Sequence, residues 1–311
     1  GGGIDDFIVG SMLYDVVSPS PRENVGMAVI IFGKLSAWTD IDMDFFTTAP
    51  DLGFRVIGKS ANDNLGVAVS SAGDVNGDGY SDVIIGAHYS DQSRNNGGTV
   101  YIIFGHGTDT LFPDIDLSSF VFTKETGFII IGAAASDRIG TSVTGDIDIN
   151  QDGYSDVVVS SSKRGMTYLI FGHSNATAYP AIDLLDLSSG GQSWGFRLGG
   201  AIESDKWFAM QVTPAGDVNA DGLNDLIIGA ADESHLGRVG CGVAFIIYGS
   251  PENSSFENVN LTSFVSGDKG FRVIGATAGD HFGWTVDGGV DINSDGVTDL
   301  VFGSRWASPS N

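Results

Sequence analysis

Short apolar runs alternate with glycine- and aspartate-rich segments along the whole chain. The runs are rich in Val, Ile and Phe, as in Val83-Ile84-Ile85 and Val157-Val158-Val159. Runs of this length and composition, bounded by turn residues, predict short β-strands. A repeated helix pair would instead place apolar residues about 3.6 positions apart, and no segment carries a convincing stripe of that kind. The pattern therefore predicts an all-β chain.

The predicted strands recur in a fixed order. A nine-residue, Asp-rich segment ends at positions 82, 156, 225 and 299, so the period is about 70 residues. We label the strands A to D, with the Asp-rich segment between A and B. Strand A is expected at 65–71, 139–144, 208–213 and 282–287, strand C at 28–33, 100–105, 168–172 and 244–249, and strand D at 53–58, 127–132, 195–199 and 270–275.

Four antiparallel strands in each period describe one blade of a β-propeller. The expected segments are a partial blade at 1–58, complete blades at 59–132, 133–199 and 200–275, and a partial blade at 276–311. The two partial blades cannot complete each other, and a free blade edge would expose unpaired backbone. We therefore expect the 311 residues to be part of a longer polypeptide.

The Asp-rich segments predict calcium loops. Positions 1, 3 and 5 are Asp, Asn and Asp in all four copies, position 6 is Gly and position 9 is Asp. Ca²⁺ takes six to eight oxygen ligands, and alternate residues of a tight turn can present them. Position 7 varies, as expected if only its carbonyl oxygen binds. Four Ca²⁺ sites follow, formed by Asp74, Asn76, Asp78, Tyr80 and Asp82; Asp148, Asn150, Asp152, Tyr154 and Asp156; Asp217, Asn219, Asp221, Leu223 and Asp225; and Asp291, Asn293, Asp295, Val297 and Asp299.

Two other interpretations of these loops are less favourable. An EF-hand requires a Glu at position 12, where this chain has an apolar residue within a strand, such as Ile85. Asp, Asn and Gly are also common turn residues. Turn formation alone, however, would not require an oxygen at every alternate position in four copies. Uncompensated carboxylates would also repel one another. Mg²⁺ fits less well than Ca²⁺, because it resists cages made only of protein ligands.

These motifs resemble the FG-GAP repeat of integrin α-subunit heads. Phe282-Gly283 matches the Phe-Gly element, and Leu65-Gly66, Ile139-Gly140 and Phe208-Ala209 are close to it. The Gly-Ala-Pro element is altered, as in Gly86-Ala87-His88. The resemblance implies a ring of about seven blades, with calcium on one face and a protein or glycan ligand on the opposite face. Candidate ligand residues in the B–C and D–A loops of that face are Arg94, Arg138, Trp207, Arg238 and His281.

Charge and composition exclude several functions. The net charge of −24, from 39 acidic and 15 basic residues, excludes a nucleic-acid partner bound through phosphate contacts. No apolar run is long enough to span a membrane in this segment, although the full chain could contain a span elsewhere. The five histidines are dispersed, and Cys241 is the one cysteine. We therefore expect no catalytic activity; an intrinsic hydrolase would need a carboxylate pair on the surface.

The sequence favours an extracellular or cell-surface location. N-glycosylation sequons begin at Asn175, Asn253 and Asn260, all in the long C–D loops. The expected function is a calcium-binding, non-catalytic adhesion or protein-assembly module. The alternative is a carbohydrate- or substrate-binding accessory domain of a secreted enzyme, because similar repeats occur in the phospholipase D that cleaves glycosylphosphatidylinositol.

Overall fold

The computed structural model describes residues 4–17, 20–36, 40–41, 43, 51–107, 112–161, 163–174, 179–188, 194–199, 211–251 and 258–307. Within these residues the regular secondary structure is almost entirely β-strand, which confirms the predicted fold class. The helical elements described are α1 (Leu184–Ser188) and the 3₁₀ turn η2 (Leu261–Ser263). No helix in the described ranges is long and apolar enough to cross a bilayer.

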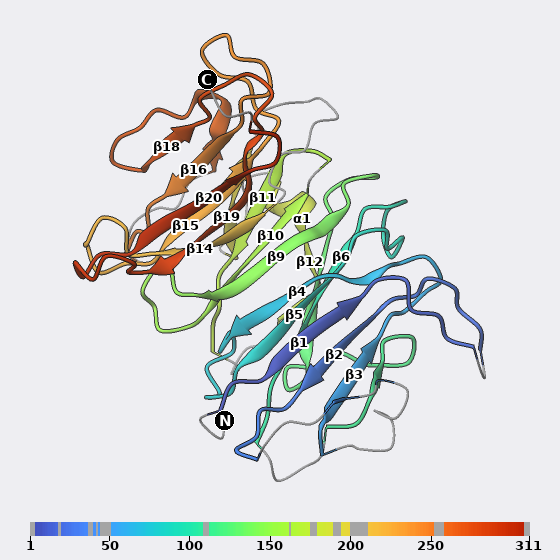
Figure 1. Ribbon diagram of the computed structural model, residues 1–311. Helices are drawn as coiled ribbons and strands as arrows, with labels where there is room; N and C mark the ends of the chain where they lie inside the picture. The colour runs from blue at the N-terminus through green and yellow to red at the C-terminus, as the bar shows by residue number, and fades with distance from the viewer. Residues whose placement is uncertain are drawn as a thin grey trace.

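The strands form five sheets that follow one another in a fan (Figure 1). The first sheet contains β1 (Phe7–Ser11), β2 (Met27–Ile31), β3 (Gly53–Ile57) and β7 (Ile115–Asp116), and the second contains β4 (Leu65–Gly73), β5 (Asp82–Ala87), β6 (Thr99–Ile103), β8 (Gly127–Ile131) and β12 (Ile182–Asp183). The third sheet contains β9 (Ile139–Ile147), β10 (Asp156–Ser161), β11 (Met166–Ile170), β13 (Gly195–Gly199) and β17 (Val259–Asn260). The fourth contains β14 (Val212–Gly216), β15 (Asp225–Ala230), β16 (Val243–Ile247) and β18 (Gly270–Ile274), and the fifth contains β19 (Phe282–Val290) and β20 (Asp299–Ser304).

Each complete sheet has the expected A-to-D order of antiparallel neighbours, as in β4-β5-β6-β8. The observed A strands are longer than expected. β4, β9 and β19 each have nine residues, because register shifts insert extra residues opposite strand B. Such bulges cannot be read from an apolar pattern of period two. The expected start of one A strand, at Phe208, lies outside the described residues.

A fifth strand was not expected from the sequence. The C–D loop of a blade extends back to the preceding sheet, where two of its residues pair in parallel with strand D. β7 pairs with β3, β12 with β8, and β17 with β13. A two-residue strand carries too few apolar positions to be predicted from a pattern. Consecutive blades are thus joined at their outer edges.

The hydrophobic cores lie between neighbouring sheets. Ile84 and Ile102 pack in one cluster with Val157 of the next sheet. Ile85 and Tyr101 pack in another cluster, with Ala28 of the preceding sheet. Because successive side chains of a strand point to opposite faces, each central blade contributes to two cores.

Contacts between glycines explain the two elements of the repeat. Gly86 of strand B lies against Gly140 of the next strand A, and a Cβ at Gly86 would stand 2.1 Å from the Gly140 carbonyl oxygen. The same contact joins Gly10 to Gly66 and Gly229 to Gly283. Gly140 itself has φ +86, a conformation that favours glycine. The Phe-Gly and Gly-Ala elements therefore meet where two blades pack most closely.

Candidate metal loops and the opposite face

The side chains of each Asp-rich loop fold inward onto the backbone of the same loop. In the first copy, Asp74 accepts the N–H groups of Asp78 at 3.0 Å and Gly79 at 2.8 Å. The amide oxygen of Asn76 also accepts the Asp78 N–H, at 2.9 Å, and Asp78 accepts the Tyr80 N–H at 3.0 Å. Gly79 has φ +89, as its position 6 predicts. The residues that favour a turn thus bring the oxygens of positions 1, 3 and 5 together.

The other three loops repeat this arrangement. The N–H of position 5 binds the oxygens of positions 1 and 3 in every copy, at 2.9–3.1 Å. The position-6 glycines have φ angles of +90, +88 and +89°. The sequence therefore specifies one local geometry four times.

The carboxylate at position 9 is buried in three of the four loops. Asp82, Asp156 and Asp225 are at most 1% exposed. Asp82 accepts the N–H of Val75 at 2.9 Å and that of Gly105, after strand C, at 2.8 Å. Burial raises the pKa of Asp82 to about 7, of Asp156 to about 8 and of Asp225 to about 6, and the neighbouring carboxylates raise these pKa values further. A nearby cation would relieve this cost.

The donor set fits calcium better than a transition metal, because every side-chain ligand is an oxygen. Within the described ranges, no three carboxylate, imidazole or thiol groups form a preformed metal cluster. The loop carboxylates hold backbone N–H groups instead. A carboxylate oxygen that accepts one N–H keeps a second lone pair, so Asp74, Asn76, Asp78 and Asp82 could hold an ion with little rearrangement.

The loops of neighbouring blades are linked to one another. Ser155, at position 8 of the second loop, donates its N–H to the Asp74 oxygen at 3.0 Å and accepts the Asp74 N–H at 3.1 Å. His173, which follows strand C of the same blade, donates its N–H to the Val75 oxygen at 3.0 Å. The sequence analysis did not single out Ser155; a serine at position 8 in two copies was the available signal.

The candidate ligand residues have different environments. Arg94 binds the Gly132 carbonyl oxygen at 2.7 Å and pairs with Asp183 of the next blade at 2.8 Å. Arg238 donates to the Ala276 carbonyl oxygen at 2.9 Å. Both therefore take part in loop structure. His281 pairs with Asp232 at 2.6 Å. Trp207 lies outside the described residues.

Arg138 is the remaining candidate of this face. Its guanidinium lies over the ring of Tyr89, with the carbon 4.7 Å from the ring centroid. His88, next to Tyr89, is half-buried. Burial, with a smaller contribution from Arg138, lowers the pKa of His88 to about 4, so its imidazole is neutral at physiological pH.

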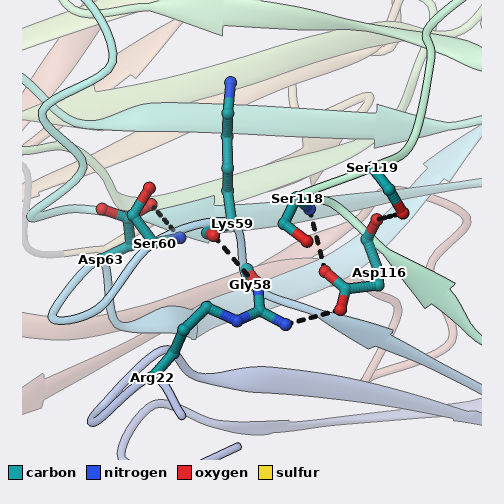
Figure 2. Close-up of polar contacts among 8 residues, drawn as sticks. All are labelled: Arg22, Gly58, Lys59, Ser60, Asp63, Asp116, Ser118 and Ser119. Carbon is teal, nitrogen blue, oxygen red and sulfur yellow. Dashed lines mark hydrogen bonds and ion pairs between the residues drawn. The ribbon is translucent and has the colours of Figure 1, made fainter. Parts of the chain in front are cut away.

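Arg22 forms a connection that sequence analysis missed. Figure 2 shows its guanidinium between the carbonyl oxygens of Gly58 and Lys59, at 2.5 and 3.0 Å, and Asp116, at 2.5 Å. Asp116 belongs to β7, which comes from the C–D loop of the next blade and pairs with β3, so the ion pair joins two consecutive blades. Arg94 and Asp183 repeat it one blade later. We call these two pairs the inter-blade clasps.

A second ion pair lies on the outer edge of the first sheet. Arg55, which recurs as Arg197 and Arg272, pairs with Asp114 at 2.5 Å. This contact has the inter-blade structural role that the recurrence suggests.

Of the three sequons, only the one at Asn260 lies in the described residues; Asn175 and Asn253 lie outside them. Asn260 is exposed at the end of β17 and accepts the Thr262 N–H at 3.0 Å. Cys241 is fully buried, in keeping with a small core residue.

Comparisons with known proteins agree with the repeat pattern. Residues 65–103 match the FG-GAP repeat family. The chain is 31% identical over 225 residues to phosphatidylinositol-glycan-specific phospholipase D of Bos taurus (68% of this chain, 24% of the relative). It is 27% identical over 313 residues to the Homo sapiens protein of the same name (90% of this chain, 33% of the relative).

Integrin α-subunits are the second group of relatives. Identity is 29% over 179 residues with integrin alpha pat-2 of Caenorhabditis elegans (52% of this chain, 12% of the relative). With integrin alpha-6 of Gallus gallus it is 28% over 196 residues (61% and 16%). The chain thus spans a third or less of the length of these relatives. Together with the bladed sheets and the glycine contacts, these matches identify the chain as an FG-GAP-repeat β-propeller similar to the heads of integrin α-subunits.

Proposed function

We propose that the chain is a calcium-stabilised, non-catalytic module for extracellular adhesion or protein assembly. The observation that carries the proposal is the fourfold repetition of one oxygen-lined loop, with a buried carboxylate at position 9 in three copies. Buried carboxylates beside other carboxylates destabilise a fold unless a cation compensates them. The relatives named integrin support the adhesion role and the extracellular location.

Calcium should therefore raise the stability of the protein. An ion at 100 times its dissociation constant stabilises the folded state by about 2.7 kcal/mol per site. We expect the melting temperature to fall on addition of excess EDTA and to recover with CaCl₂ but not with MgCl₂. Unchanged melting in EDTA would refute the calcium assignment.

Single-loop variants make this test specific. Calorimetric titration should give four ions per chain, and three when Asp148 and Asp152 are both replaced by Ala. Asp268→Asn removes one exposed acidic group outside the loops, so this matched control should still bind four. Equal stoichiometry in the two variants would contradict the assignment of the second loop.

A carbohydrate- or substrate-binding accessory domain of a secreted enzyme is the second candidate. The observation in its favour is the similarity to relatives named phospholipase D. A catalytic domain next to the propeller in the full protein would favour this candidate, and a membrane anchor would favour the first. Turnover by the chain itself, abolished by a single carboxylate substitution, would overturn both.

A further inference from the structure

Two loops meet on the face opposite the calcium loops, at the junction of the second and third sheets. Residues 88–98 connect β5 to β6, and residues 132–138 lead from β8 into β9. Four backbone hydrogen bonds tie these loops and the first residue of β9 together. They run from the N–H groups of Gly132 to Gly98 O at 3.1 Å, Ser136 to Asn95 O at 2.8 Å, Arg138 to Asn96 O at 3.1 Å, and Ile139 to Gly97 O at 3.0 Å. The junction is therefore a defined frame for the side chains it carries.

Arg138 has no carboxylate partner within ion-pair distance in the described part of the chain. The neighbouring Asp137 pairs with Arg164 at 3.2 Å and accepts the Ala134 N–H at 3.0 Å. The Nε atom of Arg138 is buried without a hydrogen-bond partner, and so is Nδ1 of His88. Both atoms are enclosed by the protein, and the Nε atoms of Arg22 and Arg238 are likewise unpartnered, so these atoms do not require an external acceptor; the terminal nitrogens of the half-buried Arg138 guanidinium are the groups that could meet one.

The backbone of Arg138 also argues for a role of its side chain. Arg138 has φ +55, in the left-handed region. The preceding blade has Asn64 at the same repeat position, with φ +57. Asn adopts this conformation readily, whereas Arg does not. Asn would fit this loop conformation better than Arg, so the loop conformation does not explain why position 138 is an arginine.

The junction of the fourth and fifth sheets can be compared with the junction that contains Arg138, and the comparison shows that a carboxylate is missing beside Arg138. His281 occupies the repeat position of Arg138, and Asp232 occupies that of Tyr89. There Nδ1 of the imidazole lies 2.6 Å from a carboxylate oxygen of Asp232. At the second junction, Tyr89 replaces the acid, and its ring supports the guanidinium from one side. A basic side chain stands at this repeat position in both junctions, but at the junction with Arg138 the neighbouring carboxylate is absent.

We propose that Arg138, supported by Tyr89 and His88, binds a carboxylate group of a partner protein on this face. The proposal rests on the proposed function, because it names the chemistry of the partner of the assembly module. A guanidinium held by a ring presents its N–H edge for two parallel hydrogen bonds to a carboxylate. The ring of His88 lies 4.1 Å from that of Tyr89, centroid to centroid, so its NMR signal reports on this site. A net charge of −24 disfavours polyanions such as phosphorylated or sulfated chains, whereas a single carboxylate meets less repulsion.

The test uses the full protein in CaCl₂, with histidines labelled at Cε1 and observed by NMR at constant pH. N-acetylaspartate amide is the probe for a protein partner, glucuronate is the probe for a glycan, and NaCl at equal ionic strength is the control. We expect a saturable shift of the His88 signal by the aspartate probe, with a dissociation constant of about 1 mM or weaker. Arg138→Gln should weaken this binding at least about tenfold.

Two variants separate loss of the site from loss of the fold. Arg305→Gln removes a guanidinium that is likewise stacked, on Trp284 at 4.1 Å and Trp306 at 4.7 Å, and should leave the His88 response unchanged. Tyr89→Asp copies the arrangement of Asp232 and should abolish the response by supplying an internal carboxylate, while the protein still melts cooperatively.

The outcomes are decisive. No saturable shift, an equal shift in Arg138→Gln, or tighter binding of glucuronate than of the aspartate probe would each overturn the proposal. Melting that does not respond to calcium would instead count against the proposed function, because the calcium loops lie at the other end of the strands.

Discussion

The inter-blade clasp of Arg22 and Asp116 gives a quantitative prediction. Arg22 is 13% exposed and Asp116 is 38% exposed. A hydrogen bond from a charged donor to a partly buried carbonyl, as at Gly58, contributes about 1.5 kcal/mol net. Because Asp116 is more than one third exposed, solvent screening limits its ion pair to about 1 kcal/mol. We expect Arg22→Gln to cost about 2–3 kcal/mol and Asp116→Asn about 1 kcal/mol.

The pH dependence of this coupling has a defined sign. Partial burial acts to raise the pKa of Asp116, but the hydrogen bonds from Arg22 and Ser118 outweigh it and lower the pKa below its ordinary value. A carboxyl whose pKa is lowered in the folded state contributes stability above its unfolded pKa of about 3.9 and loses it as the pH falls through the folded pKa. The coupling between Arg22 and Asp116 should be complete at neutral pH and disappear in acid.

A double-mutant cycle read by native-state hydrogen exchange measures the coupling. Exchange is preferred to global denaturation, because repeat proteins can open one unit at a time. The Leu117 N–H, bonded to the Ile57 oxygen at 3.0 Å, reports on the joint that the clasp secures. The control cycle uses the exposed Lys124–Glu125 pair, which should show no measurable coupling. A coupling below about 0.3 kcal/mol at neutral pH, or one unchanged in acid, would refute the reasoning.

Two further predictions concern the joints between blades. Gly86→Ala should destabilise the protein by about 3 kcal/mol or prevent folding, because a Cβ would meet the Gly140 oxygen. The control Gly267→Ala should cost little, because the space around Gly267 is open. Equal midpoints of urea unfolding for the two variants would disprove the contact. The double variant Ile129→Arg with Ala181→Asp copies the Arg55–Asp114 pair into the next blade. Its melting temperature should exceed the value obtained by adding the effects of the two single variants. Simple additivity would contradict the equivalence of these positions.

The sequence predicted the features that depend on residues close together in the chain. The turn at positions 1 to 6 of each loop depends on residues such as Asp74, Asn76 and Gly79 that lie next to one another, so its geometry follows from the pattern. The strands that flank the loops follow from their apolar runs. Bulges in β4 and β9 depend on pairing with the neighbouring strand, and their presence cannot be read from one strand alone.

The contacts between blades were not predicted, because they join residues far apart in the chain. Arg22 and Asp116 are separated by 94 positions. One signal was available: Ile115-Asp116-Leu117 recurs as Ile182-Asp183-Leu184 and Val259-Asn260-Leu261. A motif of three residues within the long C–D loops indicates an ordered element, and it marks the fifth strands. The candidate ligand face illustrates the same limit, since Arg94 and Arg138 look equivalent in the sequence but only Arg94 has a carboxylate partner in the described structure.

The repeat unit of this propeller is therefore better defined by the contacts between neighbouring sheets than by the single sheet. A single sheet would expose both of its apolar faces, lose its fifth strand and leave Gly86 or Gly140 without the backbone it packs against. Several contacts of a blade, including those of its Asp-rich loop through Ser155 and Asp74, are made with the next blade. The stability of such an array is approximately the sum of the intrinsic stabilities of its repeats and of the interface terms between neighbouring repeats. A calcium ion bound in one loop should accordingly protect the joint to the adjacent blade from exchange and have little effect two blades away.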